Sequence, residues 1–188
     1  MPNDAALSVT DLVVRFGGVT ALDGVSFTVR PGEVCGLIGP NGAGKTTLFD
    51  CVSRLTRPRS GTIELDGHDL LALPAHRVAR LGVARTFQHL GLVPSLSVRD
   101  NVMLGAQAPA GFVPSALRLP GVRTAERVLR ERADSVLERF GLAGIAAHPA
   151  VGLPYGTLKR VELARALAAE PRLLMLDEPA SGLSHGEV

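Results

Sequence analysis

A nine-residue stretch rich in glycine has the residue types and the spacing of a phosphate-binding loop. It fits the pattern G-x-x-x-x-G-K-[ST] and comprises Gly39, Pro40, Asn41, Gly42, Ala43, Gly44, Lys45, Thr46 and Thr47. Glycines allow the backbone to turn its N–H groups inward and to approach a polyphosphate closely. A lysine at this position reaches the β- and γ-phosphates, and the following hydroxyl can bind magnesium. The stretch predicts a polyphosphate site; the alternative is a glycine-rich turn that binds nothing.

An acidic pair near the C-terminal end of the chain supplies a second set of reactive groups. Residues 173–176 form a continuous apolar run, which is typical of a strand covered on both faces, and Asp177 and Glu178 follow it. A carboxylate at the end of such a strand can bind magnesium opposite a phosphate loop. A second carboxylate beside it can orient or deprotonate an attacking water. Acids are common at strand ends, so the preceding phosphate loop is what makes this pair informative.

These two motifs need strands and helices to position them. Residues 34–38 predict a buried strand before the loop, and residues 48–52 predict the start of a helix after it. Further strands are expected at residues 7–16, 25–29, 61–67 and 83–84. Helices are expected at residues 74–81, 97–107, 124–140 and 157–170, with a loop at residues 108–122. The pattern predicts an antiparallel meander followed by a more helical region.

Composition narrows the class of protein. The 188 residues are 46% hydrophobic and 20% charged, which is typical of a globular chain with a core. A net charge of +2, no Trp and a single Tyr give no support for a nucleic-acid partner. No apolar run is long enough to span a bilayer, and we see no secretory signal. Cys35 and Cys51 have neither metal nor disulfide spacing, so both are predicted to be buried packing residues.

Two further motifs lie between the phosphate loop and the acidic pair. Gln88 ends the sequence Arg-Thr-Phe-Gln after a short predicted strand, and residues 153–157 precede a predicted helix. With these motifs in this order, residues 7–188 resemble the ATP-binding subunits of ABC transporters. The resemblance implies an α/β P-loop NTPase fold that has an N-terminal antiparallel β subdomain. It also implies a partial nucleotide-binding domain over residues 7–188, with a helical insert and signature at about residues 96–170.

The resemblance assigns roles to residues that match the family's motifs. The loop from Gly39 to Thr47 would hold the triphosphate of ATP, and Phe16 would stack on adenine unless it faces the core as an ordinary strand aromatic. Mg²⁺ would be held by Thr46, Gln88 and Asp177.

Two of these assignments concern catalysis. Glu178 would be the catalytic base. Gln88 would also contact the attacking water and sense the membrane partner, unless it is an ordinary polar residue at a strand end. The loop at residues 180–183 would lie at a dimer interface.

The signature motif departs from the usual L-S-G-G-Q of the family. Leu153 and Gly156 keep the pattern, whereas Pro154, Tyr155 and Thr157 replace the serine, the first glycine and the glutamine. Proline has neither hydroxyl nor N–H, so two possible contacts with the ATP of a partner subunit are lost. We therefore hypothesise a pair of unlike ATPase subunits with unequal sites. Equal hydrolysis at both sites would count against this.

The details of several motifs resemble the branched-chain amino acid importer group. They are residues 15–18, residues 85–88, the Tyr155-Gly156 signature and the insert at about residues 106–140. The implied function is ATP hydrolysis that powers import through an integral membrane permease. The implied partners are a second ABC ATPase subunit and, indirectly, a periplasmic binding protein, with this chain cytoplasmic on the inner face of the membrane. The alternatives are an importer of amides such as urea, a non-transport ABC ATPase, and a nucleotide-binding module without catalysis.

The family also has a switch histidine beyond the acidic strand. His185 is the only histidine after Asp177, and no strand is predicted between them. The resemblance therefore implies that the fold is incomplete at its C-terminus. We expect the 188-residue chain alone to be unstable and to hydrolyse little ATP.

Overall fold

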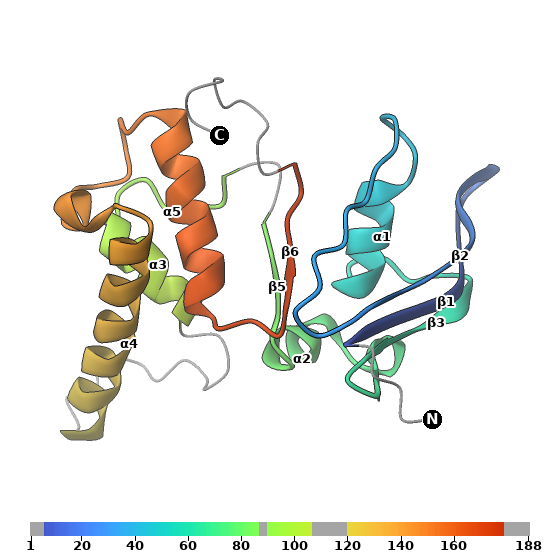
Figure 1. Cartoon of the computed structure of the whole chain (residues 1–188), viewed down its shortest axis with the longest axis horizontal. Helices are drawn as coiled ribbons and strands as arrows, with labels where there is room; N and C mark the ends of the chain where they lie inside the picture. The colour runs from blue at the N-terminus through green and yellow to red at the C-terminus, as the bar shows by residue number, and fades with distance from the viewer. Residues whose placement is uncertain (1–5, 87–89, 107–119, 179–188) are drawn as a thin grey trace. The chain divides into compact units, whose positions relative to one another are not determined.

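The computed structural model describes residues 6–86, 90–106 and 120–178, with the side chains of residues 120–125 left aside. The chain divides into two units, Met1–Val83 and Ala84–Val188. Figure 1 traces the elements of each unit, which are treated separately below.

The first unit contains an antiparallel sheet with the strand order β2-β1-β3-β4. Its strands are β1 (Leu7–Phe16), β2 (Val19–Val29), β3 (Ser60–Leu65) and β4 (His68–Asp69). The predicted strand at residues 7–16 is confirmed, and the one at residues 25–29 belongs to a longer strand. The sheet is antiparallel as predicted, but the predicted meander is wrong, because β3 pairs with β1 and not with the preceding strand β2.

Strand β1 changes the parity of its buried side chains at a bulge. Leu7 and Val9 are buried before the bulge, and Leu12 and Val14 are buried after it. The register with both neighbouring strands shifts in this stretch, where Asp11 has a φ of 47°. The extra residue lets both halves of β1 direct apolar side chains into the same core.

Three short helical segments complete the first unit: α1 (Lys45–Val52), η1 (Leu70–Ala72) and α2 (Ala75–Arg80). The helices predicted at residues 48–52 and 74–81 are confirmed. Helix α1 buries Leu48, Cys51 and Val52, which lie on one face because they are three or four residues apart.

The predicted buried strand at residues 34–38 is wrong. This stretch has irregular structure, Val34 and Ile38 are each 97% exposed, and Cys35 is exposed, so the expectation that Cys35 is a packing residue is also wrong. A continuous apolar run becomes a buried strand only when neighbouring strands pair with its backbone and other layers cover both faces. No described strand pairs with residues 34–38.

The second unit combines a pair of short strands with three longer helices. Strand β5 (Val83–Arg85) begins at the division between the units and pairs with β6 (Leu173–Met175). Both strands were predicted, whereas their pairing was not. The helices are α3 (Val98–Ala106), α4 (Pro120–Arg139) and α5 (Tyr155–Ala168), and a 3-10 segment η2 spans Ala143–Ile145.

The start of α4 differs from the prediction, whereas the start of α3 agrees with it. Helix α4 begins at Pro120 rather than at Thr124, so residues 120–122 of the predicted loop are helical; residues 108–119 lie outside the described part. Proline is favoured in the first turn of a helix because the N–H groups there have no partner within the helix, so the N–H that proline lacks is not needed. Helix α3 begins as predicted, because the Asp100 N–H donates to Ser97 Oγ at 3.0 Å.

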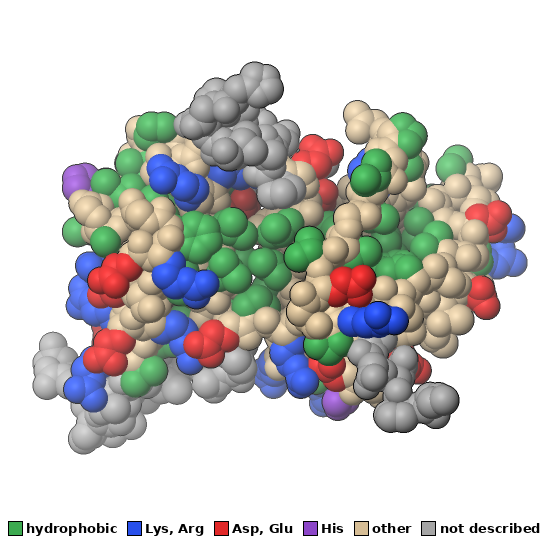
Figure 2. All heavy atoms as spheres, viewed as in Figure 1, with side chains coloured by type: hydrophobic (Ala, Val, Ile, Leu, Met, Phe, Trp, Pro, Cys, Tyr) green, Lys and Arg blue, Asp and Glu red, His purple; other side chains and the backbone are tan. Residues whose placement is uncertain are grey.

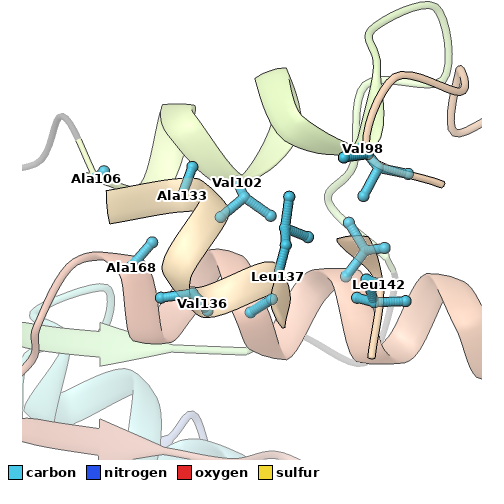
Figure 3. Close-up of a cluster of buried hydrophobic side chains, with 11 residues drawn as sticks. Val98, Val102, Ala106, Ala133, Val136, Leu137, Leu142 and Ala168 are labelled. Atoms are coloured by element: carbon cyan, nitrogen blue, oxygen red, sulfur yellow. The ribbon is translucent and has the colours of Figure 1, made fainter. Parts of the chain in front are cut away.

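The three helices of the second unit share one apolar core (Figure 3). Its buried members are Val98, Val102, Ala106, Ala133, Val136, Leu137, Leu142, Ala146, Val161, Ala164 and Ala168. Val128 of α4 is 47% exposed and lies outside this core. Several members are alanines, so the helix backbones can approach one another closely.

The surface of the second unit carries interspersed charges. On the face shown in Figure 2, basic and acidic side chains alternate over the helices. The ion pairs of this unit include Arg127 with Glu131 and Arg99 with Asp134. Within the described residues, no helix is both long enough and apolar enough to cross a membrane.

Candidate functional site

The glycine-rich loop forms a tight turn that ends at the start of α1. The Ala43 N–H donates to the Pro40 carbonyl at 3.1 Å, and the Leu48 N–H donates to the Gly44 carbonyl at 2.9 Å. Gly42 and Gly44 have φ values of 82° and 84°, in the left-handed region that favours glycine. The sequence therefore places left-handed residues where the backbone must reverse before the helix begins.

Gly44 is also fixed by its close packing against β2. A Cβ atom at this position would lie 2.4 Å from the Ala21 carbonyl oxygen and 2.7 Å from Leu22 Cδ2. Both distances are shorter than real Cβ contacts, and the first is to backbone that cannot move aside easily. Only glycine fits here, so the antiparallel sheet holds the loop at its last glycine.

The side chain of Lys45 turns back to the first residues of its own loop. Its Nζ atom donates to the carbonyl oxygens of Gly39 at 2.7 Å and of Pro40 at 2.8 Å. Helix α1 begins at this residue and has no acidic side chain in its first turn. The ammonium group and the N-terminus of α1 both favour an anion. Thr46, in the first turn, is exposed, so its hydroxyl is accessible to solvent.

Phe16 lies at the end of β1, next to the tight hairpin turn at residues 17–18. It pairs with Val19 across this turn and is 53% exposed. The alternative in which Phe16 packs into the core is therefore wrong. An exposed ring at the end of the strand is available for stacking, and its contact with adenine stays a prediction.

The acidic pair follows β6 and is anchored to the residues at the end of β5. Asp177 is 6% exposed, and its Oδ2 atom lies 3.2 Å from Arg85 Nη2. The Asp177 N–H donates to Thr86 Oγ1 at 3.1 Å, and the Thr86 N–H donates to the Met175 carbonyl at 3.0 Å. Side chain and backbone of Asp177 are thus both held by two consecutive residues of the neighbouring segment.

Glu178 differs from Asp177 in exposure and in backbone conformation. It is exposed, and its φ of 47° is in the left-handed region, which non-glycine residues adopt rarely. Such a conformation costs about 1–3 kcal/mol and persists only where its surroundings impose it. Consecutive residues thereby present one buried carboxylate and one accessible carboxylate.

The signature residues form the start of α5. Pro154 precedes the helix with a φ of −55° and a ψ of 148°, and its carbonyl accepts from the Leu158 N–H at 3.0 Å. Tyr155 is 41% exposed, and Lys159 Nζ lies 5.8 Å from the centre of its ring. Gly156 is buried, whereas Leu153 and Thr157 are half-buried. Proline leaves this helix without a side-chain cap.

The predicted site residues fall into two sets. The first unit carries Phe16 and the phosphate loop, and the second unit carries the acidic pair and the signature. Gln88 and the loop at residues 180–183 lie outside the described residues. In the described part of the chain, no group of three or more His, Cys, Asp or Glu residues could hold a metal by itself.

Sequence reasoning missed the roles of Arg85 and Thr86 as partners of Asp177. The motif that contains Gln88 includes both residues, but their contact with Asp177 joins positions 92 and 91 residues apart. The only available signal was that Arg85 and Thr86, like Asp177, directly follow a predicted strand.

Comparisons with known proteins agree on one family. The model of the family described as "ABC transporter" matches residues 22–181. The chain is 43% identical to the high-affinity branched-chain amino acid transport ATP-binding protein LivG of Escherichia coli K12, over 96% of this chain and 72% of that protein. It is 40% identical to the corresponding BraF protein of Pseudomonas aeruginosa, with the same two coverages.

A solved structure shows the same fold. The ADP conformation of MJ1267, described as an ATP-binding cassette of an ABC transporter, aligns with 97% of this chain and 72% of that chain. The TM-score is 0.82 and the sequence identity is 31%.

Proposed function

Because this chain belongs to the ABC transporter family, we propose that it is the ATP-binding and hydrolysing subunit of a branched-chain amino acid importer. The observation that carries the proposal is the glycine loop, whose left-handed glycines and bridging Lys45 form a turn at the start of α1. The similarity to LivG and BraF, which are described as branched-chain amino acid transport ATP-binding proteins, supports the choice of substrate.

The residues present are suited to hold ATP with Mg²⁺. A Cβ at Gly44 would collide with β2, so only glycine fits there, and glycines allow phosphate oxygens to approach the backbone closely. Thr46 and Asp177 offer a hydroxyl and a carboxylate, the hard oxygen ligands that Mg²⁺ prefers. We propose that Gly39–Thr47 bind the triphosphate, that Phe16 stacks on adenine, and that Thr46, Gln88 and Asp177 hold the metal. The bound metal neutralises charge on the phosphates.

The acidic pair divides the catalytic work. Glu178 is exposed, so its carboxylate can accept a proton from a water that attacks the γ-phosphate. Asp177 is buried and anchored by Arg85 and Thr86, which suits a residue that must keep a fixed position. Gln88 is assigned a place beside the same water. Its assignment rests on the family motif.

The signature would act on the ATP of a partner subunit. In this proposal the domain covers residues 7–188, and its helical insert at about residues 96–170 presents Leu153, Tyr155, Gly156 and Thr157 to that partner. Tyr155 is exposed enough for such a contact, and Pro154 offers neither hydroxyl nor N–H. We therefore propose a pair of unlike ATPase subunits. The pair binds a membrane permease from the cytoplasmic side, and a periplasmic binding protein delivers the amino acid.

The test is substrate-dependent ATP hydrolysis by the assembled transporter. This chain is reconstituted with the permease and the second ATPase of its transporter, and the binding protein is supplied with leucine or with urea. We expect leucine, and not urea, to stimulate hydrolysis. Replacing Glu178 by Gln should leave ATP binding intact and reduce turnover by a factor of at least about 100. Stimulation by urea alone would overturn the proposed substrate, and full turnover of the Gln variant would overturn the proposed base.

A further inference from the structure

The ion pair between Arg85 and Asp177 is the most deeply buried contact between opposite charges from different elements in the described residues. The two side chains are 6% and 8% exposed, and Arg85 Nη2 lies 3.2 Å from Asp177 Oδ2. Arg85 is the last residue of β5, and Asp177 follows the paired strand β6, 92 positions further along the chain. The contact uses Oδ2 and leaves Oδ1 outside the ion pair.

A second contact fixes the backbone of the same residue. The hydroxyl of Thr86 accepts from the Asp177 N–H at 3.1 Å, and Thr86 is itself tied to β6 through the Met175 carbonyl. Thr86 is 6% exposed. Asp177 is therefore held at its backbone and at one carboxylate oxygen by adjacent residues. This gives the carboxylate a defined position in the absence of any ligand.

A buried carboxylate needs an opposite charge. Removing one member of a buried ion pair leaves the other charge uncompensated, which is strongly destabilising. A divalent cation bound at Asp177 would supply positive charge at the same carboxylate. The contribution of Arg85 to the stability of the folded protein should therefore be greatest when no cation is bound at Asp177.

We propose that Arg85 is the resident counter-ion of Asp177 and sets the position of this carboxylate before a divalent cation binds there. This inference rests on the metal-binding role proposed for Asp177. Arg85 is a positioning residue, because it acts through Asp177. Without Arg85, the folded protein should depend on the cation for the charge that the guanidinium normally provides.

Thermal unfolding of the purified chain tests this inference. The wild type is compared with Arg85→Met, Arg85→Lys and Asp177→Asn, in EDTA and in Mg²⁺, with a non-hydrolysable ATP analogue present throughout. The matched control is Lys159→Met, which removes the buried ion pair between Lys159 and Glu162 of the same unit. If Arg85→Met does not fold, Arg85→Gln replaces it, because glutamine keeps an N–H donor without the charge.

In EDTA we expect Arg85→Met to unfold at a temperature lower than the wild type by about 5 °C or more. Mg²⁺ should reduce this difference to less than half, and Arg85→Lys should restore most of the loss in both conditions. Lys159→Met should lose the same amount with and without Mg²⁺. A loss in Arg85→Met that Mg²⁺ does not change, or a Lys variant as unstable as the Met variant, would overturn the inference.

The Asp177→Asn variant separates this inference from the proposed function. If Mg²⁺ stabilises the wild type and Asp177→Asn equally, Asp177 does not hold the metal, so the proposed metal role fails and the counter-ion role falls with it. If Mg²⁺ stabilises the wild type but not Asp177→Asn, while the loss in Arg85→Met is the same with and without Mg²⁺, the metal role stands and the counter-ion inference alone is wrong.

Discussion

Lys45 has two possible roles at the scale of single residues. In this structure its ammonium group bonds to two carbonyl oxygens of its own loop, Gly39 O and Pro40 O. The same group is the one charged side chain of the glycine-rich motif, so in the proposed function it would be the main source of attraction for the polyphosphate. One atom, Lys45 Nζ, thus bonds to the loop in this structure and would attract the anion in the proposed function.

Replacing Lys45 by Ala should weaken ATP binding by a factor of at least about 10, because charge-assisted hydrogen bonds contribute about 1.5–3 kcal/mol each. Titration with a fluorescent ATP analogue measures the change. The control is Arg57→Ala, which removes the same charge from an exposed residue of the same unit. If the two variants bind the analogue equally well, Lys45 does not contact the phosphates.

Among the helices of the second unit, α3 packs closely against α5. Gly105 lies in α3, and a Cβ at this position would lie 2.0 Å from the Arg165 carbonyl oxygen of α5. The guanidinium of Arg165 donates to the Gly91 carbonyl oxygen, which connects the segment before α3 to the same helix. The signature lies at the start of α5, so this packing positions it.

We expect Gly105→Ala to lower the free energy of unfolding by about 1–3 kcal/mol, even though alanine favours helix, because overpacking forces α3 and α5 apart. Urea unfolding followed by circular dichroism measures the difference. Gly144→Ala is the matched control, since a Cβ there meets no atom within 4 Å. A Gly105→Ala variant as stable as this control would show that the helices do not pack as described.

The irregular stretch before the phosphate loop can be tested through the two cysteines. Cys35 is exposed, whereas Cys51 is buried, and burial together with the negative charge of Asp50 raises the pKa of the Cys51 thiol to about 11. A raised pKa means that the reactive thiolate of Cys51 is scarce at pH 8 and becomes abundant only above about pH 11.

A maleimide reagent at pH 8 should therefore label one thiol of the folded chain quickly, and peptide mapping should identify it as Cys35. The second thiol, Cys51, should react only after denaturant is added. Rapid labelling of Cys51, or protection of Cys35 in the folded chain, would contradict the structure. Protection of Cys35 would instead favour the buried strand that the sequence predicts.

Local signals predicted the elements whose causes are local. The alternation at residues 7–16 and the Ser97–Asp100 cap each depend on neighbours in sequence, and both elements form as expected. The strand predicted at residues 34–38 was wrong because a buried strand also needs distant backbone to pair with it, and an apolar run does not show whether such a partner exists. For the same reason the contact of Arg85 and Thr86 with Asp177 was missed, since it joins residues about 90 positions apart.

At the scale of the whole molecule, the chain distributes its candidate groups over two units. The phosphate loop depends on the antiparallel sheet, which holds Gly44, and the acidic pair depends on β5, which carries Arg85. Each unit thus prepares its own groups by contacts made within that unit. The proposed function requires both sets, whereas recognition of the polyphosphate requires mainly the first.

Equilibrium binding of ATP by the purified chain tests whether the glycine-rich loop, held by its close packing at Gly44, binds the polyphosphate. Two variants are compared with the wild type: Gly44→Ala, whose Cβ would collide with Ala21, and Gly18→Ala, whose Cβ would meet nothing within 4 Å. We expect the wild type and Gly18→Ala to bind ATP with similar affinity, and Gly44→Ala to bind it more weakly by a factor of at least about 10. Equal binding by both variants, or no binding by the wild type, would contradict this expectation.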